Sequence, residues 1–305
     1  MEATGQQLSK STSTIDASMR PTESLVRMTL LRFWRDKAAV VAMVVLIVFA
    51  LLAATAPWLS ENVTHHEPNL LDLSKRFQLP SKVHWLGTDD VGRDVLTRLL
   101  YGARISLGIG LLAAMVAISF GGFVGAVSGY FGGFLDDLIN AVINTLLSVP
   151  TIFMLILLAA FVRPTPAMIA VIIGSIGWMG VARLVRGGVL AVKARDYILA
   201  AQVVGADNRR IILQHILPNV SSTIIVVLYI DIAGAILSES SLSFLGLGVQ
   251  PPDPSWGSML QNSLSYLFRA PYLIFPPGLA IFFTVLCLYI LGDGLRDALD
   301  PRLKE

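Results

Sequence analysis

Six long apolar stretches constrain the fold of this chain more than any other feature of its sequence. They cover residues 38–57, 105–135, 138–162, 164–182, 220–245 and 271–292. A helix needs roughly 20 residues to cross the hydrocarbon core of a bilayer, and a barrel strand needs only about half as many. Because lipid tolerates only helices and closed barrels, stretches of this length predict an all-α polytopic membrane protein with six transmembrane helices.

The composition supports this class and suggests the domain limits. Hydrophobic residues make up 54% of the 305 residues, charged residues make up 14%, and the mean hydropathy is +0.69. The first 37 residues are polar and carry six Lys and Arg, so no cleavable signal peptide is evident. We expect a cytoplasmic N-terminal arm at 1–37, a six-span transmembrane domain at 38–295 and a cytoplasmic C-terminal tail at 296–305.

The second and third stretches contain residues typical of helix–helix contacts in membranes. The second holds eight glycines, which let helices approach closely. The third holds Asn140 and Asn144, one helical turn apart. We expect these asparagines to hydrogen-bond between helices rather than to contact a transported molecule.

The distribution of Lys and Arg favours an orientation with both termini in the cytoplasm. With that orientation the inner segments hold 15 Lys and Arg and the outer segments hold 8, although the first outer loop alone carries six. Cytoplasmic loops of membrane proteins are enriched in these residues. Residues 195–218, between the fourth and fifth spans, are therefore expected in the cytoplasm.

Two short helices joined by a tight turn are expected in this 195–218 loop. The first should end at Gly205, because glycine reaches the left-handed C-cap conformation at the least cost. Asp207 or Asn208 can cap the second helix, and Pro218 should stop it where the fifth span begins.

The loop also offers small and basic side chains to a partner. Ala200 and Ala201 leave the first helix slim, while Arg209 and Arg210 place positive charge at its border. The residues alone leave two interpretations open. The loop is either a helix pair shaped to fit another protein or a solvated basic segment that only fixes the topology.

The 195–218 loop resembles the cytoplasmic coupling loop of permeases of binding-protein-dependent ABC importers. The family pattern is Glu-Ala-Ala, three residues, Gly, nine residues and Ile-x-Leu-Pro. The matching positions are Ala200, Ala201, Gly205, Leu217 and Pro218. Leu199 replaces the Glu and His215 replaces the Ile, so no role of that Glu can be carried over. Both departures are familiar in the permeases of peptide and nickel importers.

Three further segments resemble the second permease subunit of that branch. They are LGTDDVGRDVLTRLLYGARISL at 86–107, SLSFLGLGVQPPDPSWGSML at 241–260 and LGDGLRDALDPRLK at 291–304. Together with the 195–218 loop they extend from residue 86 nearly to the C-terminus. A chance match to all four is improbable, because each is long and unusual in composition.

The resemblance implies the fold, location and partners of the chain. The fold is that of a type I ABC importer permease in the bacterial inner membrane, and the substrates are di- or oligopeptides. The implied partners are a homologous permease in a heterodimer, two ATPase subunits that hold ATP and Mg, an extracytoplasmic substrate-binding protein and membrane lipid. The implied coupling residues are Ala200, Ala201, Gly205, Asp207, Arg209, Arg210, Leu217 and Pro218.

Two of the resembling segments lie in expected outer loops, where the family implies contact with the binding protein. The docking candidates are Asp89, Asp90, Arg93 and Trp256. For the charged residues, a structured lid with internally paired charges is favoured over direct contact with substrate.

Two carboxylates lie within the fifth stretch. Asp231 is near its middle, where charge is costly, so we expect it to face a pathway or a partner subunit rather than lipid. Glu239 is near its outer end, where hydroxyls such as those of Ser238 or Ser241 should satisfy it.

The sequence argues against an enzyme and a metal site. No G-x-x-x-x-G-K-[ST] phosphate loop is present, so ATP should be hydrolysed by partner subunits, and we expect neither a cofactor nor a nucleic-acid partner for this chain. His65, His66 and His84 lie in the first outer loop, and polar filler is favoured over a zinc site for such a group.

The competing function is an ion-gradient-driven secondary transporter or channel. Such a protein should show several intramembrane charges and two paired halves. This chain has essentially one mid-span carboxylate, Asp231, and no obvious repeat. The 195–218 loop also argues against it, because an ion-driven carrier has no need of a helix pair that enters another protein.

Overall fold

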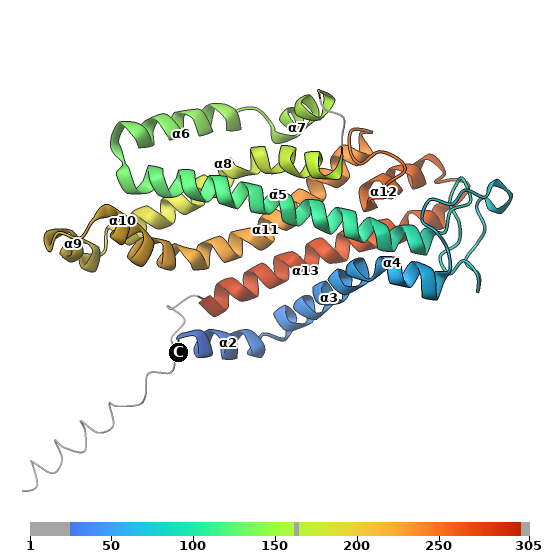
Figure 1. The fold of residues 1–305 in the computed structure, drawn as a ribbon, viewed down its shortest axis with the longest axis horizontal. Coiled ribbons are helices and arrows are strands. Elements are labelled where there is room, and N and C mark those ends of the chain that lie inside the picture. Colours follow the sequence, from blue (N-terminus) through green and yellow to red (C-terminus); the bar gives the residue numbers. More distant parts are fainter. Residues whose placement is uncertain (1–24, 162–164, 300–305) are drawn as a thin grey trace, which may run out of the picture.

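Long, nearly parallel helices dominate the computed structural model, which describes residues 25–161 and 165–299 (Figure 1). The long helices are α3 (Lys37–Ala54), α5 (Val95–Phe131), α8 (Pro166–Lys193), α11 (Leu217–Phe244) and α13 (Phe275–Leu299). These helices, with short extensions of two of them, give five segments long and apolar enough to cross a membrane. A sixth is reached if the bent pair α6 (Gly133–Leu147) and α7 (Thr151–Ala160) counts as one span. The predicted all-α polytopic class is confirmed.

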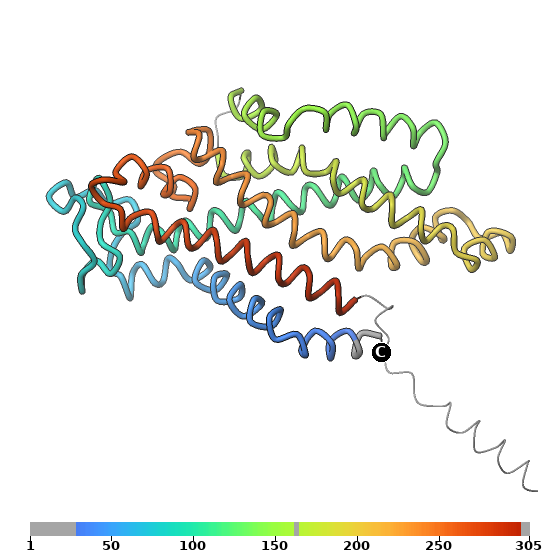
Figure 2. Tube along the Cα trace, turned by 180° about the vertical axis from the view of Figure 1, so that it is seen from behind, coloured from blue at the N-terminus to red at the C-terminus, as the bar shows by residue number. Residues whose placement is uncertain are grey.

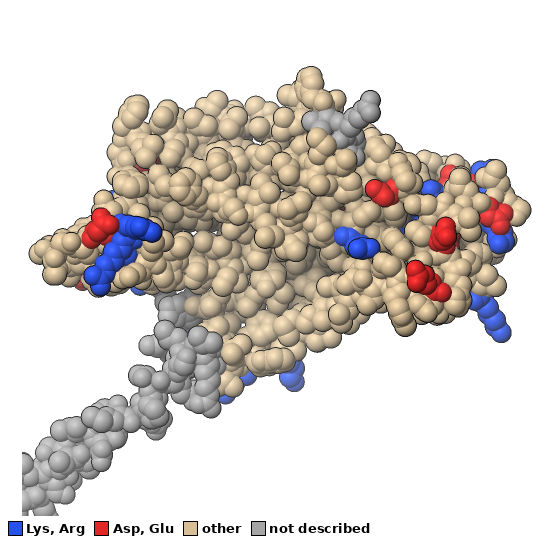
Figure 3. Space-filling view, viewed as in Figure 1, with Lys and Arg blue, Asp and Glu red and all other residues tan. Residues whose placement is uncertain are grey.

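The short elements gather at the two ends of the bundle. They are α2 (Leu25–Arg35), α4 (Ala56–Leu59), η1 (Ser60–Thr64), η2 (Leu73–Lys75), α9 (Asp196–Val203), α10 (Asn208–Arg210), η3 (Ile211–Ile216), α12 (Trp256–Ser265) and η4 (Pro271–Leu273). The start of α2 and the end of α13 lie toward the same end as α9 and α10, and α12 lies toward the other (Figures 1 and 2). Charged side chains also gather at these ends, and the face between them is mostly uncharged (Figure 3). This pattern suits a bundle whose middle lies in lipid.

Glycines bring α5 and α8 into backbone contact. A Cβ built on Gly121 would lie 2.4 Å from the carbonyl oxygen of Trp178, and one built on Gly125 would lie 2.4 Å from that of Ala182. On α8, a Cβ built on Gly174 would lie 2.6 Å from the carbonyl oxygen of Ala113. Small residues on both helices therefore permit the close approach that the glycine-rich second stretch predicts.

The third predicted span is interrupted. Helix α6 ends at Leu147, α7 begins at Thr151, and the two are bent by 82°. Pro150 lies at the break, where it has no N–H to donate and disfavours a helical Val149. The stretch 138–162 is therefore a bent helix pair rather than one straight helix, and residue 162 lies outside the described residues.

Several helices are longer than the apolar stretches that predict them. Helix α5 begins at Val95 rather than at residue 105, because Asp94 caps it by accepting a 2.8 Å hydrogen bond from the Thr97 N–H. Helix α8 likewise continues to Lys193. A stretch that is defined by uncharged residues ends at the first Arg, whereas a helix ends where its backbone is capped. The expected arm at 1–37 and tail at 296–305 fall partly outside the described residues.

Pro218 does not end a helix, contrary to expectation. The helical path continues from α10 through η3 into α11, and Pro218 lies in the first turn of α11. Segment η3 is a π-helix, whose wider turn accommodates a residue that cannot donate a backbone hydrogen bond. The 195–218 loop is therefore joined to α11 without a break in helical structure.

Candidate functional site

The 195–218 loop projects from one end of the bundle (Figure 1) and is anchored there by a buried side chain. Ile198 of α9 is fully buried, with 0% of its surface exposed, and it packs in a cluster with Ile211 and Ile216 of η3 and Val189 of α8. One buried side chain therefore fixes α9 against the two elements that flank it. The same cluster includes Val220 of α11, so α8, α9 and α11 share one core here.

Gly205 makes the turn that the sequence predicts. Its φ is +85°, in the region that favours glycine. The Gly205 N–H donates to the Gln202 carbonyl oxygen at 3.0 Å, and the Ala206 N–H donates to the Ala201 carbonyl oxygen at 3.0 Å. This pair of bonds is the Schellman motif, which closes the C-terminus of α9. Asp207 occupies the N-cap position of α10, but its side chain makes no capping bond there.

The projecting surface of the loop is apolar with a basic border. Val203 and Val204 are 87% and 88% exposed, and Leu199 is 51% exposed. These three residues were not among the predicted coupling residues; of those that were, Ala201 is half-buried and the exposed ones are Ala200, Gly205, Asp207, Arg209, Arg210, Leu217 and Pro218. A patch of this kind on a loop end is typical of a protein-binding surface.

A polar contact that the sequence did not reveal joins this loop to α5. The Tyr130 hydroxyl donates a 2.7 Å hydrogen bond to Oδ1 of Asn208, and Lys193 Nζ donates to the Tyr130 carbonyl oxygen at 2.5 Å. Tyr130 and Asn208 are 78 residues apart in the chain, so no local pattern could indicate the contact. It connects the end of α5 to the start of α10.

A second polar network fixes α6 beside α8. Arg186 donates from Nε and from an Nη to the two carboxylate oxygens of Asp136, each at 2.6 Å. Asp136 also accepts from Ser128 and from Asn140, and Asn144 accepts from Arg183. Of the two asparagines expected to bond between helices, Asn144 does so and Asn140 bonds within α6.

Asp231 lies between three helices, beside a cavity of about 60 Å³. Small residues of α5 and α8 line this cavity, among them Ala113, Ala117, Gly174 and Gly177. Oδ2 of Asp231 is buried and has no hydrogen-bond partner among the described residues. The carboxylate therefore faces the interior of the bundle, and its assignment to the pathway stays a prediction.

Glu239 is fully buried in a ring of hydroxyl groups. Its Oε1 accepts hydrogen bonds of 2.7 Å from Ser243 and 2.7 Å from Ser255, and its Oε2 accepts a long one of 3.4 Å from Ser106. The prediction that hydroxyls satisfy Glu239 is confirmed, but Ser241 bonds within its own helix to the Leu237 carbonyl oxygen. These bonds link α5, α11 and the start of α12.

The loop before α5 forms a structured lid at the other end of the bundle. Arg93 Nε lies 2.6 Å from Asp89 Oδ2, and Arg93 also lies 3.8 Å from Asp90. Arg98 lies 3.8 Å from Asp89. The charges are therefore paired with one another, as in the favoured interpretation.

Trp256, the fourth docking candidate, is buried at the start of α12. Its ring Nε1–H donates to the Leu99 carbonyl oxygen at 3.1 Å. Trp256 therefore fixes α12 on α5, and a docking role for it, as for Asp89, Asp90 and Arg93, stays a prediction.

Two families of known proteins match this chain over residues that include the helices and loops described above. Residues 117–305 match the family described as "binding-protein-dependent transport system inner membrane component". Residues 24–80 match the family described as "N-terminal TM domain of oligopeptide transport permease C". The 195–218 loop and α11 lie within the first match, and α3 lies within the second.

Curated relatives match over most of their own length. The chain is 41% identical to the dipeptide transport system permease protein DppC of Alkalihalophilus pseudofirmus, over 89% of this chain and 88% of the relative. It is 39% identical to the oligopeptide transport system permease protein OppC of Bacillus subtilis, over 92% and 91%. It is 40% identical to the glutathione transport system permease protein GsiD of Pectobacterium atrosepticum, over 90% and 90%. None of these names supports an ion-gradient-driven carrier.

The all-helical fold, the candidate membrane spans and both family matches indicate the same class of membrane permease. Members of this family are permease components, which are not themselves catalytic. The chain belongs to the binding-protein-dependent transport system inner membrane components, among the relatives of the dipeptide and oligopeptide permeases.

Proposed function

We propose that this chain is one of two homologous permeases in an ATP-driven importer of dipeptides or oligopeptides. The two permeases form a heterodimer and enclose the pathway between them. Two separate ATPase subunits bind ATP and Mg. One of them binds the 195–218 loop of this chain, and the other binds the corresponding loop of the partner permease. An extracytoplasmic binding protein delivers the peptide to the lid end.

The observation that carries this proposal is the exposed apolar surface of α9 on a rigidly anchored loop. Val203 and Val204 project from the protein, while Ile198 behind them is buried against α8 and η3. A loop that only fixed topology would need basic residues but no such surface. The names of the relatives, which include dipeptide and oligopeptide permeases, support the substrate class.

Mechanical transmission follows from the continuity of the helices. When the ATPases close on ATP, α9 moves with the subunit that holds it. Because α9 is anchored to α8 and because η3 continues into α11, both long helices tilt with the loop. Tilting of α8 and α11 against the partner permease opens the pathway to the other side.

The orientation is tested by tags in intact cells. A tag after Glu305 and one near Gly5 should both resist external protease, and a tag next to the exposed His65 should be cut. If the two termini report opposite sides of the membrane, the placement of the 195–218 loop in the cytoplasm is wrong.

The substrate class is tested with the purified heterodimer, its ATPases and its binding protein in lipid nanodiscs. Dipeptides or oligopeptides should stimulate ATP hydrolysis only when the binding protein is present. Stimulation by a different solute class and by no peptide would contradict the proposal.

A further inference from the structure

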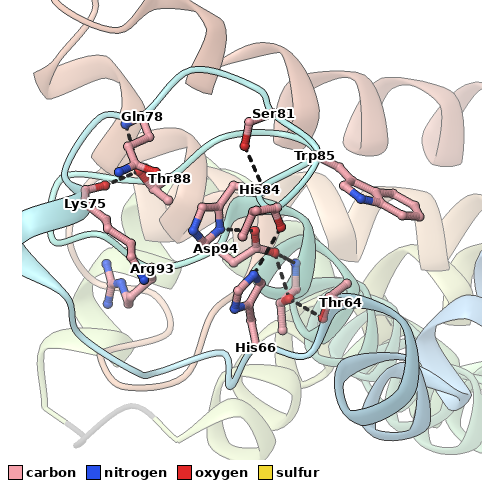
Figure 4. A network of polar contacts seen from close by, with 12 residues as sticks. Thr64, His66, Lys75, Gln78, Ser81, His84, Trp85, Thr88, Arg93 and Asp94 are labelled. Atoms are coloured by element: carbon pink, nitrogen blue, oxygen red, sulfur yellow. Dashed lines mark hydrogen bonds and ion pairs between the residues drawn. The ribbon is translucent and has the colours of Figure 1, made fainter.

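A cluster of two histidines and an aspartate lies in the lid, where the loop after α4 meets the start of α5 (Figure 4). One potential ligand atom from each of His66, His84 and Asp94 lies within 4.8 Å of the other two. His84 and Asp94 are each only 4% exposed, and His66 is half-buried. The two imidazole rings stack, with their centroids 4.5 Å apart.

The hydrogen bonds of His84 leave one ring nitrogen unused. Nδ1 of His84 lies 3.0 Å from Oδ1 of Asp94. Nε2 is buried and has no hydrogen-bond partner among the described residues. A neutral imidazole that donates from Nδ1 presents a lone pair at Nε2. A carboxylate that holds the opposite nitrogen in this way is the usual partner of a metal-binding histidine.

The surrounding bonds fix Asp94 and leave His66 able to turn. Oδ2 of Asp94 accepts from the Thr97 N–H and from the Thr97 hydroxyl, both at 2.8 Å, so Oδ1 remains directed to His84. The His66 ring stacks on His84, and its nitrogens make one hydrogen-bond contact among the described residues, between Nε2 and the Val83 carbonyl oxygen at 3.2 Å. The terminal torsion of a histidine is broad, and one ligand atom of His66 already lies within 4.8 Å of ligand atoms of His84 and Asp94, so only a modest turn of the His66 ring is needed to share a cation with His84.

We propose that His66, His84 and Asp94 form a binding site for a divalent transition metal of the zinc class. The two imidazoles supply nitrogen ligands, and Asp94 supplies the negative charge and orients His84. Imidazole ligands select Zn²⁺, Co²⁺ or Ni²⁺ over Mg²⁺ and Ca²⁺, which prefer sites made of oxygen. The proposal departs from the sequence-based expectation of no metal site, because sequence spacing did not place Asp94 beside the histidines.

The bound metal would join two parts of the lid. His66 follows η1 at the outer end of the first span, whereas Asp94 is the N-cap of α5. A hydrogen bond of 2.8 Å between the hydroxyls of Thr97 and Thr64 already joins the same two parts. Metal binding therefore cross-links the end of the first span to the start of α5 and stabilises the lid.

His65 provides a matched control beside the cluster. It is exposed, and its Nδ1 lies 2.8 Å from the Glu61 carbonyl oxygen rather than near His84. His65→Ala and His66→Ala thus remove the same ring from adjacent positions, and only His66→Ala removes a proposed ligand. Both positions are accessible enough that loss of the ring should not prevent folding.

The experiment measures Co²⁺ binding to the full chain in its complex, purified in detergent with an affinity tag that contains no histidine and stripped with a chelator. We expect saturable visible absorption bands typical of nitrogen coordination, displaced by Zn²⁺ and not by Mg²⁺. Loss of a ligand should weaken binding by about tenfold or more, as disturbance of metal-site partners does. His66→Ala should show this loss, and His65→Ala should bind like the parent chain.

A second measurement uses thermal unfolding of the same samples. Zn²⁺ should raise the melting temperature of the parent chain and of His65→Ala, because a ligand that binds only the folded state stabilises it. It should not raise that of His66→Ala. Absence of saturable Co²⁺ binding in the parent chain, or equal binding in both variants, would overturn the proposal. The His84–Asp94 hydrogen bond would then serve only to orient Asp94 as the N-cap of α5.

Discussion

The Tyr130 hydroxyl at the end of α5 donates a 2.7 Å hydrogen bond to Oδ1 of Asn208 at the start of α10. This contact joins the second span directly to the 195–218 loop. Helices α8 and α11 are joined to the same loop by the chain itself. Three long helices thus converge on the element that we propose the ATPase grips.

Tyr130→Phe should weaken the coupling of transport to ATP hydrolysis without preventing membrane insertion. The substitution keeps the ring and removes one hydrogen bond, which typically contributes about 0.5–1.5 kcal/mol. We expect binding-protein-stimulated ATP hydrolysis to fall several-fold, by about the factor that this free energy represents. Tyr289→Phe is the control, because Tyr289 is an exposed residue of α13 without a hydrogen bond among the described residues. Equal stimulation in both variants would show that the Tyr130 contact transmits nothing.

Gly125→Ala should destabilise the bundle strongly. A Cβ at this position would lie 2.4 Å from the carbonyl oxygen of Ala182, so α5 and α8 would have to separate. Overpacking of this kind costs about 1–3 kcal/mol or more. Gly122→Ala is the matched control, because a Cβ there meets nothing within 4 Å. Thermal melting of both variants in detergent checks this, and a Gly125→Ala melting temperature at or above that of Gly122→Ala would contradict the close packing.

Asp136→Asn should loosen α6 from the bundle. The substitution removes the charge that accepts two 2.6 Å hydrogen bonds from Arg186. Hydrogen bonds to charged groups contribute about 1.5–3 kcal/mol, and partial exposure of Arg186 places the expected loss near the lower value. Labelling of a cysteine introduced at Ile143, which α6 buries in the folded bundle, should become faster. Asp137→Asn, at the exposed neighbouring position, should leave the labelling rate unchanged, and an equal change in both would remove the special role of Asp136.

Much of the helical architecture could be predicted from local sequence, because apolar length and glycine follow simple rules. Gly205 is the best case, since its positive φ and the helix it ends were both expected. Pro150 and Pro218 show the limit of such rules. Pro150 breaks a span, whereas Pro218 is accommodated by a π-turn, and the difference depends on the surrounding backbone.

Contacts between residues that lie far apart in the chain could not be predicted from the sequence. Glu239 was expected to bond with hydroxyls near it in the chain, but Ser106 and Ser255 reach it from other elements. Asn208 was expected only as a possible helix cap, and nothing in the sequence paired it with Tyr130. Hydrophobic patterns indicate which face of a helix is buried, and they do not indicate which polar atoms meet there.

Asp231→Asn should leave assembly of the complex intact and alter transport. The side chain lies beside a cavity, and Oδ2 has no partner among the described residues, so loss of its charge breaks no hydrogen bond made by that atom. Peptide uptake into vesicles at matched protein level measures the effect. If Asp231→Asn abolishes the folded complex, the carboxylate has a buried pairing role instead. Normal uptake by Asp231→Leu would exclude both roles.

Gly205→Val tests most directly the central claim that the 195–218 loop couples this permease to an ATPase. A β-branched residue at a φ of +85° costs about 1–3 kcal/mol of backbone strain, and its side chain also obstructs the contact surface. Gly205→Asn is the matched variant, because asparagine tolerates the left-handed conformation and keeps the turn. The measurement is binding-protein-stimulated ATP hydrolysis by the purified complex. We predict normal insertion and normal pairing with the partner permease for Gly205→Val, with loss of stimulated hydrolysis, and a milder loss for Gly205→Asn. Parental ATP hydrolysis and uptake in Gly205→Val would contradict the assignment of this loop.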